Sequence, residues 1–261
     1  MGGAATPART RRRVLGPISL ALGVWIAASS PARAYLLDLS DATVAGRGAL
    51  ELELQPLGYV GSPEQGGHRL VVPSINAVFG LGEGWDLTLT TRGFVDLDAP
   101  SYAVGQQGAM FRVLLLDGAY SGGAFAGPSL ALQWGAYLPD VGGDEGMLAP
   151  SVAVLASQAI GDASVHVHAE AILGPDRTAE GFFSAVLQGP STWAVVPVVE
   201  VWIDVVPDAA TVSGLLGAIV PISGDVSLEA GFRAAGWAAL EELEGRLAVL
   251  WATRWLPDAP R

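Results

Sequence analysis

Apolar and polar residues alternate along most of this chain. Residues 163–173 (ASVHVHAEAIL) show the pattern most clearly, because single apolar residues separate His166, His168 and Glu170 from one another. Successive side chains of a β-strand point to opposite faces, so this segment is predicted to be a strand with one ionisable and one apolar face. The same period of two recurs in nearly every apolar run. The pattern therefore predicts an all-β protein.

Twelve segments fit this description, and strand counts from ten to fourteen stay compatible with the pattern. The last segment also fits an amphipathic helix over residues 239–256, but strict alternation from Gly245 onward favours a strand. The predicted strands span residues 48–57, 69–79, 85–95, 109–116, 124–138, 147–159, 163–173, 181–187, 192–206, 211–220, 226–233 and 243–256.

Composition decides which face of these strands points outward. The chain is 51% hydrophobic and only 15% charged, which is too apolar for an ordinary soluble domain. After residue 34, no stretch approaches the roughly 20 apolar residues that a membrane-spanning helix needs. Frequent turns, with 34 Gly and 17 Pro, fit many short strands instead. We therefore predict a transmembrane antiparallel up-and-down β-barrel whose apolar faces contact lipid.

Two further features bear on the membrane hypothesis. Transmembrane barrels have short periplasmic turns and longer external loops, so the odd-numbered connections should be long. We expect this of the first, third, fifth, seventh and eleventh connections, whereas the second, sixth, eighth, ninth and tenth are short. Interfacial girdles of such barrels are aromatic, and the tryptophans near predicted strand ends are Trp85, Trp193, Trp237, Trp251 and Trp255.

Residues 1–34 have the order of features found in a signal peptide. The basic run at residues 9–13 precedes an apolar stretch at 14–28, and residues 29–34 (SSPARA) end in a small-x-small pattern. A single membrane anchor is the alternative, although the apolar stretch is short and contains Pro17 and Gly23. We predict a signal peptide at residues 1–34, a barrel at 35–261, and location in a bacterial outer membrane.

Charge limits the classes of partner. Residues 35–261 contain nine basic and 26 acidic groups, a formal net charge of −17, so nucleic acid is not an expected partner. The chain has no cysteine, which excludes disulfides and thiolate metal sites. Acidic residues in the predicted external loops should favour cations at the mouth; they are Glu64, Asp96, Asp98, Asp140, Asp144 and Glu145.

Ionisable residues on the predicted strands share the face opposite to the apolar one. A basic residue on the lipid face costs about 2–4 kcal/mol near the bilayer midplane, so these residues are predicted to point into the lumen. They form either a structural network of ion pairs and water or a polar constriction that selects solutes. The predicted lumen residues are Glu51, Glu53, Asp86, Arg92, Arg112, His166, His168, Glu170, Glu200, Asp204, Glu229, Arg233, Arg246 and Arg254.

Three alternatives to a channel are compatible with parts of the sequence. His166, His168 and Glu170 share one strand face and are weak candidates for a transition-metal site. A lipid hydrolase needs a serine and a histidine base, and the candidate pairs join His166 or His168 with Ser151, Ser157 or Ser184. No GxSxG motif marks any of these serines. The third alternative is a soluble two-sheet binding protein with a packed core.

Several segments resemble bacterial outer-membrane barrels associated with the phenol meta-degradation pathway, a family grouped as transporters. The resemblance is carried by residues 42–56 (ATVAGRGALELELQP), 75–89 (INAVFGLGEGWDLTL), 135–146 (GAYLPDVGGDEG), 198–204 (VVEVWID) and 217–236 (GAIVPISGDVSLEAGFRAAG).

The resemblance implies a barrel for passive passage or uptake of small molecules, hydrophobic or aromatic ones among them. It implies outer-membrane lipid and the barrel-assembly machinery as partners, a small-molecule solute, no catalytic residue and no cofactor. Such barrels usually end on an aromatic residue, whereas here residues 256–261 follow Trp255. A plugged barrel with a structural or binding role, or an outer-membrane lipid hydrolase, is the alternative.

Overall fold

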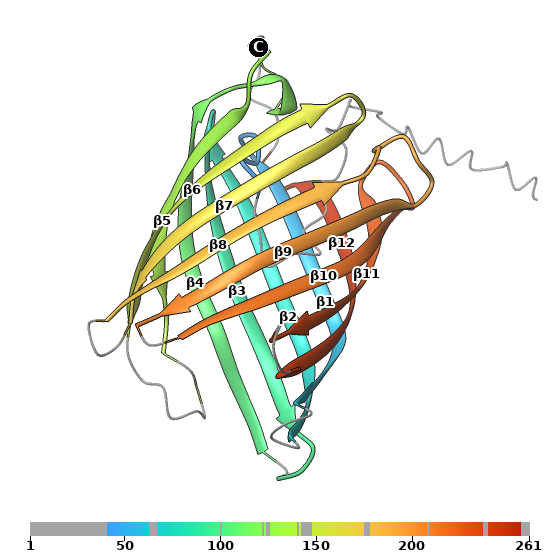
Figure 1. The fold of residues 1–261 in the computed structure, drawn as a ribbon. Coiled ribbons are helices and arrows are strands. Elements are labelled where there is room, and N and C mark those ends of the chain that lie inside the picture. The colour runs from blue at the N-terminus through green and yellow to red at the C-terminus, as the bar shows by residue number, and fades with distance from the viewer. Residues whose placement is uncertain are drawn as a thin grey trace, which may run out of the picture.

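The chain folds into one closed barrel of twelve antiparallel strands (Figure 1). The computed structural model describes residues 41–62, 67–99, 101–121, 123, 126–139, 141, 148–174, 178–207, 209–236 and 240–256. Each strand pairs with its sequence neighbours, and β12 closes the barrel against β1. The strands are β1 (Ala49–Ser62), β2 (Gly67–Gly82), β3 (Trp85–Asp96), β4 (Ser101–Leu116), β5 (Ser129–Tyr137), β6 (Ala149–Ile160), β7 (Ala163–Leu173), β8 (Ala179–Gln188), β9 (Val196–Val206), β10 (Ala209–Pro221), β11 (Val226–Ala235) and β12 (Glu242–Arg254).

This architecture confirms the predicted twelve-strand barrel. The soluble two-sheet alternative is wrong, because all twelve strands belong to a single closed sheet. The helical alternative for residues 239–256 is also wrong, because β12 pairs with both β1 and β11 along its length. Among the described residues, no helix is long and apolar enough to cross a membrane.

Connections lie alternately at the two ends of the barrel. We call the end with the β1–β2, β3–β4 and other odd-numbered connections the odd end, and the opposite end, where β1 begins and β12 finishes, the even end. The predicted rule of long odd connections holds only in part. The fifth connection (138–148) is long, but β1 and β4 extend further than expected and leave only residues 63–66 and 97–100 as connections. At the even end, residues 117–128, which include the 3-10 helix η1 (Ala119–Ser121), and residues 189–195 are longer than expected.

Bulges at two prolines explain two differences from the sequence prediction. Strand β1 is longer than predicted, and in part of β2 the inward and outward residues are exchanged. Pairing of β1 with β12 skips from Leu54 to Leu57, and pairing of β2 with β3 skips from Val71 to Ser74. Proline lacks an N–H donor, so inside a sheet it is confined to edges and bulges. Strands thus continue through Pro56 and Pro73, but the inside–outside phase changes. Val71 is fully buried inside the barrel, whereas strict alternation through residues 69–79 would place it on the outward face with Ile75 and Phe79.

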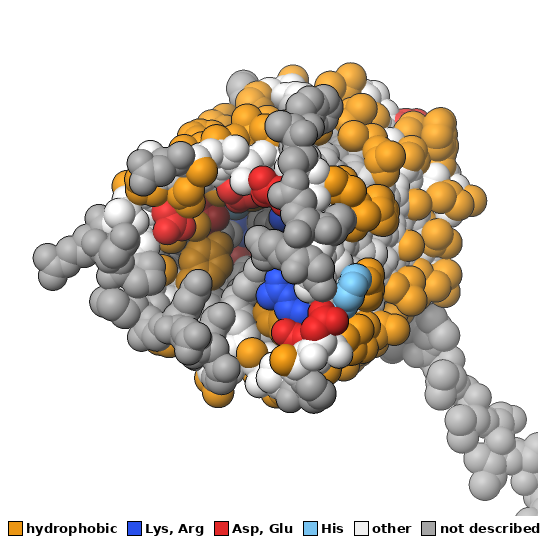
Figure 2. Space-filling view, turned by 60° about the horizontal axis from the view of Figure 1, so that its bottom comes forward, with side chains coloured by type: hydrophobic (Ala, Val, Ile, Leu, Met, Phe, Trp, Pro, Cys, Tyr) orange, Lys and Arg blue, Asp and Glu red, His pale blue; other side chains and the backbone are white. Residues whose placement is uncertain are grey.

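Apart from such bulges, the strands alternate as predicted, with apolar side chains outside. Leu216 is 67% exposed, Phe183 54% and Leu247 52%, although all three are apolar. Figure 2 shows hydrophobic side chains covering much of the outer wall. The exposed tryptophans Trp85, Trp193, Trp251 and Trp255 lie at or near the even end, whereas Trp237 falls outside the described residues. This exterior suits lipid contact and not water.

Inside the barrel, the half toward the even end is filled. Val186, Val196, Val198 and Ile219 of β8–β10 form one apolar cluster, against which Phe182 packs. On the other side, residues 41–45 enter the lumen before β1 begins, and we call them the inserted segment. Its Ala42 is fully buried against Ala131, Ala153 and Leu155. The remaining space therefore lies toward the odd end.

Candidate functional site

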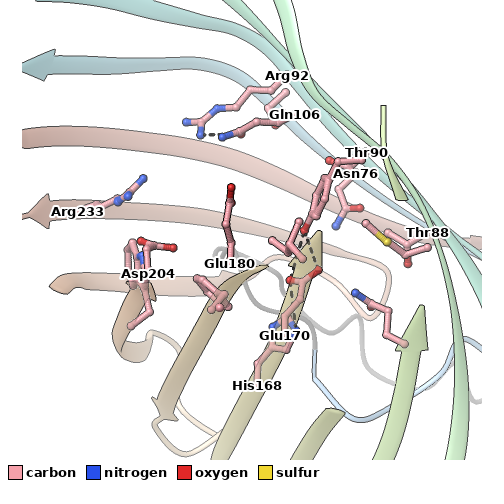
Figure 3. Close-up of a pocket in the computed structure, with 18 of the residues that line it drawn as sticks. Asn76, Thr88, Thr90, Arg92, Gln106, His168, Glu170, Glu180, Asp204 and Arg233 are labelled. Carbon is pink, nitrogen blue, oxygen red and sulfur yellow. Dashed lines mark hydrogen bonds and ion pairs between the residues drawn. The ribbon is translucent and has the colours of Figure 1, made fainter. Parts of the chain in front are cut away.

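A charged cavity occupies the half of the lumen toward the odd end. Its volume is about 390 Å³, within the range of small-molecule sites. Figure 2 shows a hollow at this end with acidic and basic side chains inside it. Side chains from most strands line the cavity, and they fall into a basic, an acidic and aromatic, and a neutral polar wall (Figure 3).

Three arginines and one glutamate form the basic wall. Glu244 of β12 is fully buried and accepts hydrogen bonds from Arg92 of β3, Arg233 of β11 and Arg246 of its own strand. The Nη2 atom of Arg246 lies 2.9 Å from Glu244 Oε2, and the Nη1 atom of Arg233 lies 3.4 Å from it. Arg233 also stacks over the Trp202 ring at 4.7 Å. Three guanidinium groups thus share one buried carboxylate.

Gln106 of β4 supports Arg92 from the other side. The Nη1 atom of Arg92 donates to Gln106 Oε1 over 3.3 Å. Gln106 has a φ of 49°, in the left-handed region that residues other than glycine seldom adopt. It lies at the bulge where β3–β4 pairing shifts between Thr90 and Arg92. The irregular backbone thus belongs to the site, as is common for strained positions.

The acidic and aromatic wall comes from β7, β8 and β9. Tyr137 of β5 donates its hydroxyl to Glu170 at 3.2 Å. His168 Nε2 lies 3.7 Å from Glu170 Oε2, and its ring meets Phe182 edge-on at 5.4 Å. Glu180 and Asp204 line the cavity nearer the mouth. In Figure 3, Glu170 and His168 lie across the cavity from Arg92.

The neutral polar wall comes from β1, β2 and β3 and, beyond β4, from β5. Each of its members has a buried polar atom with no hydrogen-bond partner among the described residues. Gln55 contributes Nε2, Asn76 Oδ1, Thr88 Oγ1 and Gln133 Oε1. Buried polar groups in folded proteins normally have partners, protein or water. This wall therefore offers both donors and acceptors to whatever fills the cavity.

The closed even end is held by a second ion pair. Arg112 Nη2 lies 2.7 Å from Asp86 Oδ2, and both side chains are fully buried. The inserted segment binds this pair, because Arg112 also donates to the Asp41 carbonyl and the Ala45 N–H donates to Asp86. Tyr120 of η1 donates to the Asp41 carboxylate at 3.0 Å. The pair, the inserted segment and η1 together close this end.

The structure distributes the fourteen predicted lumen residues over these two regions and the space between them. Three of them lie in the closed even end: Asp86, Arg112 and His166. Two more, Glu200 and Glu229, are buried among other inward-facing side chains. Arg254 is exposed at the even end, and Glu51 is half-buried on the inner face of β1. The predicted residues that line the cavity are Glu53, Arg92, His168, Glu170, Asp204, Arg233 and Arg246.

The sequence pattern did not predict two parts of the lumen, namely Glu244 and the inserted segment. Glu244 lies two residues before Arg246 and so shares its strand face. The alternation of the sequence could therefore have identified Glu244 as a lumen residue. The inserted segment had no such signal, because residues 41–45 form no strand and carry no period of two. Of the acidic loop residues, Asp96 and Asp98 lie at the β3–β4 turn, whereas Glu64, Asp140, Asp144 and Glu145 fall outside the described residues.

The metal and hydrolase hypotheses find little geometric support. Within the described residues, no group of three or more His, Asp or Glu side chains is placed to hold a metal ion. His166 does pair with Ser157, with 2.9 Å between Nδ1 and Oγ. The hydroxyl of Ser157, however, also accepts the N–H of Ala42, and both side chains are buried beneath the inserted segment. A lipid substrate could not approach this serine with the segment in place.

Comparison with solved structures places the fold among porin barrels. The NanC porin superimposes with a TM-score of 0.56 at 8% identity, covering 77% of this chain and 98% of that one. The KdgM porin in complex with disordered oligogalacturonate gives 0.54 at 7% identity, covering 78% and 98%. At this identity the similarity shows the fold alone. No protein-family model matches the chain, and no curated protein matches its sequence.

Proposed function

We propose that this chain is an outer-membrane β-barrel for the passive passage or uptake of small molecules. The observation that carries the proposal is one closed barrel with an apolar exterior and a charged, water-accessible cavity. Only a closed barrel lets strands cross lipid with every backbone group paired. The shared fold with the KdgM and NanC porins supports the same role.

The proposed orientation follows from the predicted signal peptide at residues 1–34. Export would leave the N-terminus of β1, and with it the even end, on the periplasmic side. The cavity would then open to the outside, and the exposed outer wall would contact outer-membrane lipid after insertion by the barrel-assembly machinery. None of the residues is assigned a catalytic role in this proposal.

Hydrophobic or aromatic solutes, which the phenol-pathway resemblance implies, are one candidate cargo. Met110, Ile172, Phe182 and Trp202 line the cavity beside its charged groups and provide an apolar surface for them. The plugged alternative also has a specific observation in its favour, because the inserted segment fills the even end. Passage then requires that this segment move, whereas a binding barrel would keep it in place.

Leakage from liposomes tests the proposal directly. Residues 35–261 would be refolded into liposomes, and a parallel chain would begin at residue 47, without the inserted segment. We expect the shorter chain to release small solutes several-fold faster. In planar bilayers, its ion preference should shift with Arg246→Ala and Glu51→Gln and respond to His168→Ala. A heat-modifiable barrel that never leaks in either form would overturn passage and favour the plugged binding role.

A further inference from the structure

Three carboxylates surround one aromatic ring on the acidic and aromatic wall. Phe182 of β8 pairs directly with Glu170 of β7 on one side and with Asp204 of β9 on the other. Glu180 lies two residues before Phe182 on the same strand, so its side chain shares the inward face. All four side chains line the cavity. In Figure 3, Glu180 lies between Asp204 and Glu170. Strand pairing thus places an aromatic ring among three acidic side chains.

Carboxylates outnumber arginines in the cavity, whichever pairs they form. Besides the three arginines of the basic wall, the lining includes four carboxylates, those of Glu53, Glu170, Glu180 and Asp204. The same arginines already share a further carboxylate, that of Glu244. Arg233 reaches the acidic and aromatic wall by stacking over Trp202, but it also lies 3.4 Å from Glu242. Among the described residues the cavity is therefore net negative, and a cation would balance its charge.

Two buried polar side chains beside these carboxylates indicate a ligand that donates hydrogen bonds. His168 lies two residues before Glu170 and is 3% exposed, yet neither ring nitrogen has a hydrogen-bond partner among the described residues. Gln133 is 6% exposed, and its Oε1 also lacks a partner there. Gln133 and Glu170 flank the small residue Ala153 on the strand between them. A neutral imidazole has one acceptor nitrogen and the amide oxygen is an acceptor, so both fit an N–H donor.

We propose that the acidic and aromatic wall binds a small protonated amine with an apolar body, an inference that rests on the proposed function. The ammonium group would lie beside the Phe182 ring, because the face of an aromatic ring attracts cations. It would donate to Glu170, which accepts a hydrogen bond from Tyr137 and has lone pairs left, and to the acceptor nitrogen of His168. The apolar body would contact the apolar side chains that line the cavity nearby, which are Met110, Ile172 and Trp202.

Other cations fit this wall less well. Phe182 stands between the carboxylates of Glu170 and Asp204, and no group of three or more described His, Asp or Glu side chains is placed to hold a metal ion. A quaternary ammonium would use the carboxylates and the ring, but it has no N–H to donate to His168 and Gln133. A protonated amine uses all of these groups together.

Four ligands that each carry one functional group on a phenyl ring or benzyl group separate these chemistries. At neutral pH, benzylamine is a cation with N–H donors, benzyltrimethylammonium is a cation without them, benzyl alcohol is neutral and benzoate is an anion. Residues 35–261 would be refolded in detergent and titrated by calorimetry, with detergent alone subtracted. Benzylamine should have a Kd about ten-fold below that of benzyl alcohol. Benzyltrimethylammonium should bind with an intermediate Kd, and benzoate should bind most weakly.

Single substitutions then assign the preference to this wall. Glu170→Gln and Glu180→Gln should each weaken benzylamine binding several-fold and leave benzyl alcohol binding unchanged. Phe182→Leu should weaken both cations relative to benzyl alcohol, because it removes the ring. Glu83→Gln, the matched control, removes an exposed carboxylate in the β2–β3 turn and should change nothing. Heat-modifiable migration in gels verifies that each variant is folded, and Glu180, which is only partly buried, supplies an informative variant if Glu170→Gln does not fold.

The outcomes that would overturn the amine site are distinct from failure of passage. Benzylamine binding no tighter than benzyl alcohol, or benzoate or benzyltrimethylammonium binding tightest, would each refute a protonated amine as the ligand. Folded Glu170→Gln and Glu180→Gln variants that both behave like Glu83→Gln would refute its place on this wall. All of these results are compatible with continued leakage of solutes from liposomes, which would leave the proposed passage intact. Conversely, selective benzylamine binding by a barrel that never leaks would uphold the site and refute passage.

Discussion

The buried ion pair of Asp86 and Arg112 holds the closed even end of the lumen together. Asp86 accepts hydrogen bonds from Arg112 through Nε and Nη2 and from the Ala45 N–H, and neither charged side chain is exposed to solvent. A buried ion pair contributes little when compared with apolar residues, but loss of one partner leaves an uncompensated charge. Asp86 is therefore the residue of the closed even end whose removal should lower the free energy of unfolding most.

Substitution of Asp86 by alanine should lower the free energy of unfolding by about 3–5 kcal/mol, because Arg112 would be left buried without its carboxylate. Asp225→Ala, in the exposed β10–β11 turn at the same end, is the matched control and should change it by less than about 0.5 kcal/mol. Urea unfolding of both variants in lipid vesicles measures the difference. Equal losses would mean that the Asp86–Arg112 pair does not stabilise the fold.

The strands could be predicted from the sequence because polar and apolar residues alternate along them. The bulges and the inserted segment could not be predicted, because they leave no such pattern. Alternation alone predicts Asp86, His166 and Glu200 on the inner face, and in the structure all three side chains are buried. Val71 was assigned wrongly, because a bulge at Pro73 changes the phase and leaves no mark in a pattern of period two. Contacts between the beginning and the end of the chain, such as that of Arg92 on β3 with Glu244 on β12, depend on barrel closure, which no local pattern encodes.

The pH response of Asp96 tests the hydrogen-bonded structure of the β3–β4 turn. Asp96 Oδ1 accepts the backbone N–H groups of Ala99 and Asp98, which hold the pKa of this carboxyl below its ordinary value of 3.8. A lowered pKa means that the charged form stabilises the turn. This contribution is present above pH 3.8 and is lost as the pH falls through the lower folded pKa.

Amide chemical shifts of Asp98 and Ala99 should therefore move together in an acid titration, with a midpoint below pH 3.8. The Asp96→Asn variant should abolish this transition and give shifts near those of the acidified parent, because its side chain carries no charge. A midpoint at or above 3.8 would show that the two N–H bonds do not favour the ionised carboxylate.

The whole molecule combines a lipid-compatible exterior with a lumen closed at one end. The exterior comes from the alternation, since the strands send apolar side chains outward. The inward side chains are polar at many positions and aliphatic in the clusters of the even end. What differs between the ends is the filling: aliphatic side chains and the inserted segment at the even end, a charged cavity at the odd end. Of these two fillings, only the inserted segment belongs to no strand, so it is the one that could move while the barrel stays closed.

Gly80 of β2 provides a way to move that segment without deleting it. A Cβ atom at Gly80 would overlap the carbonyl oxygen of Gly46 and lie 2.7 Å from that of Ala45, so no side chain fits while the inserted segment is in place. A Cβ at Gly82, two residues along the same strand, would meet nothing within 4 Å. Gly80→Ala should therefore displace the inserted segment, and Gly82→Ala should not.

We expect Gly80→Ala to raise single-channel conductance and solute leakage several-fold toward the level of the chain that begins at residue 47, while Gly82→Ala matches the parent. Combining Gly80→Ala with that truncation should add nothing further, because both changes act on one segment. If Gly80→Ala folds as a heat-modifiable barrel and leaks no faster than Gly82→Ala, the inserted segment is not what closes the lumen. The closure would then lie in the aliphatic cluster of β8–β10, which neither change touches.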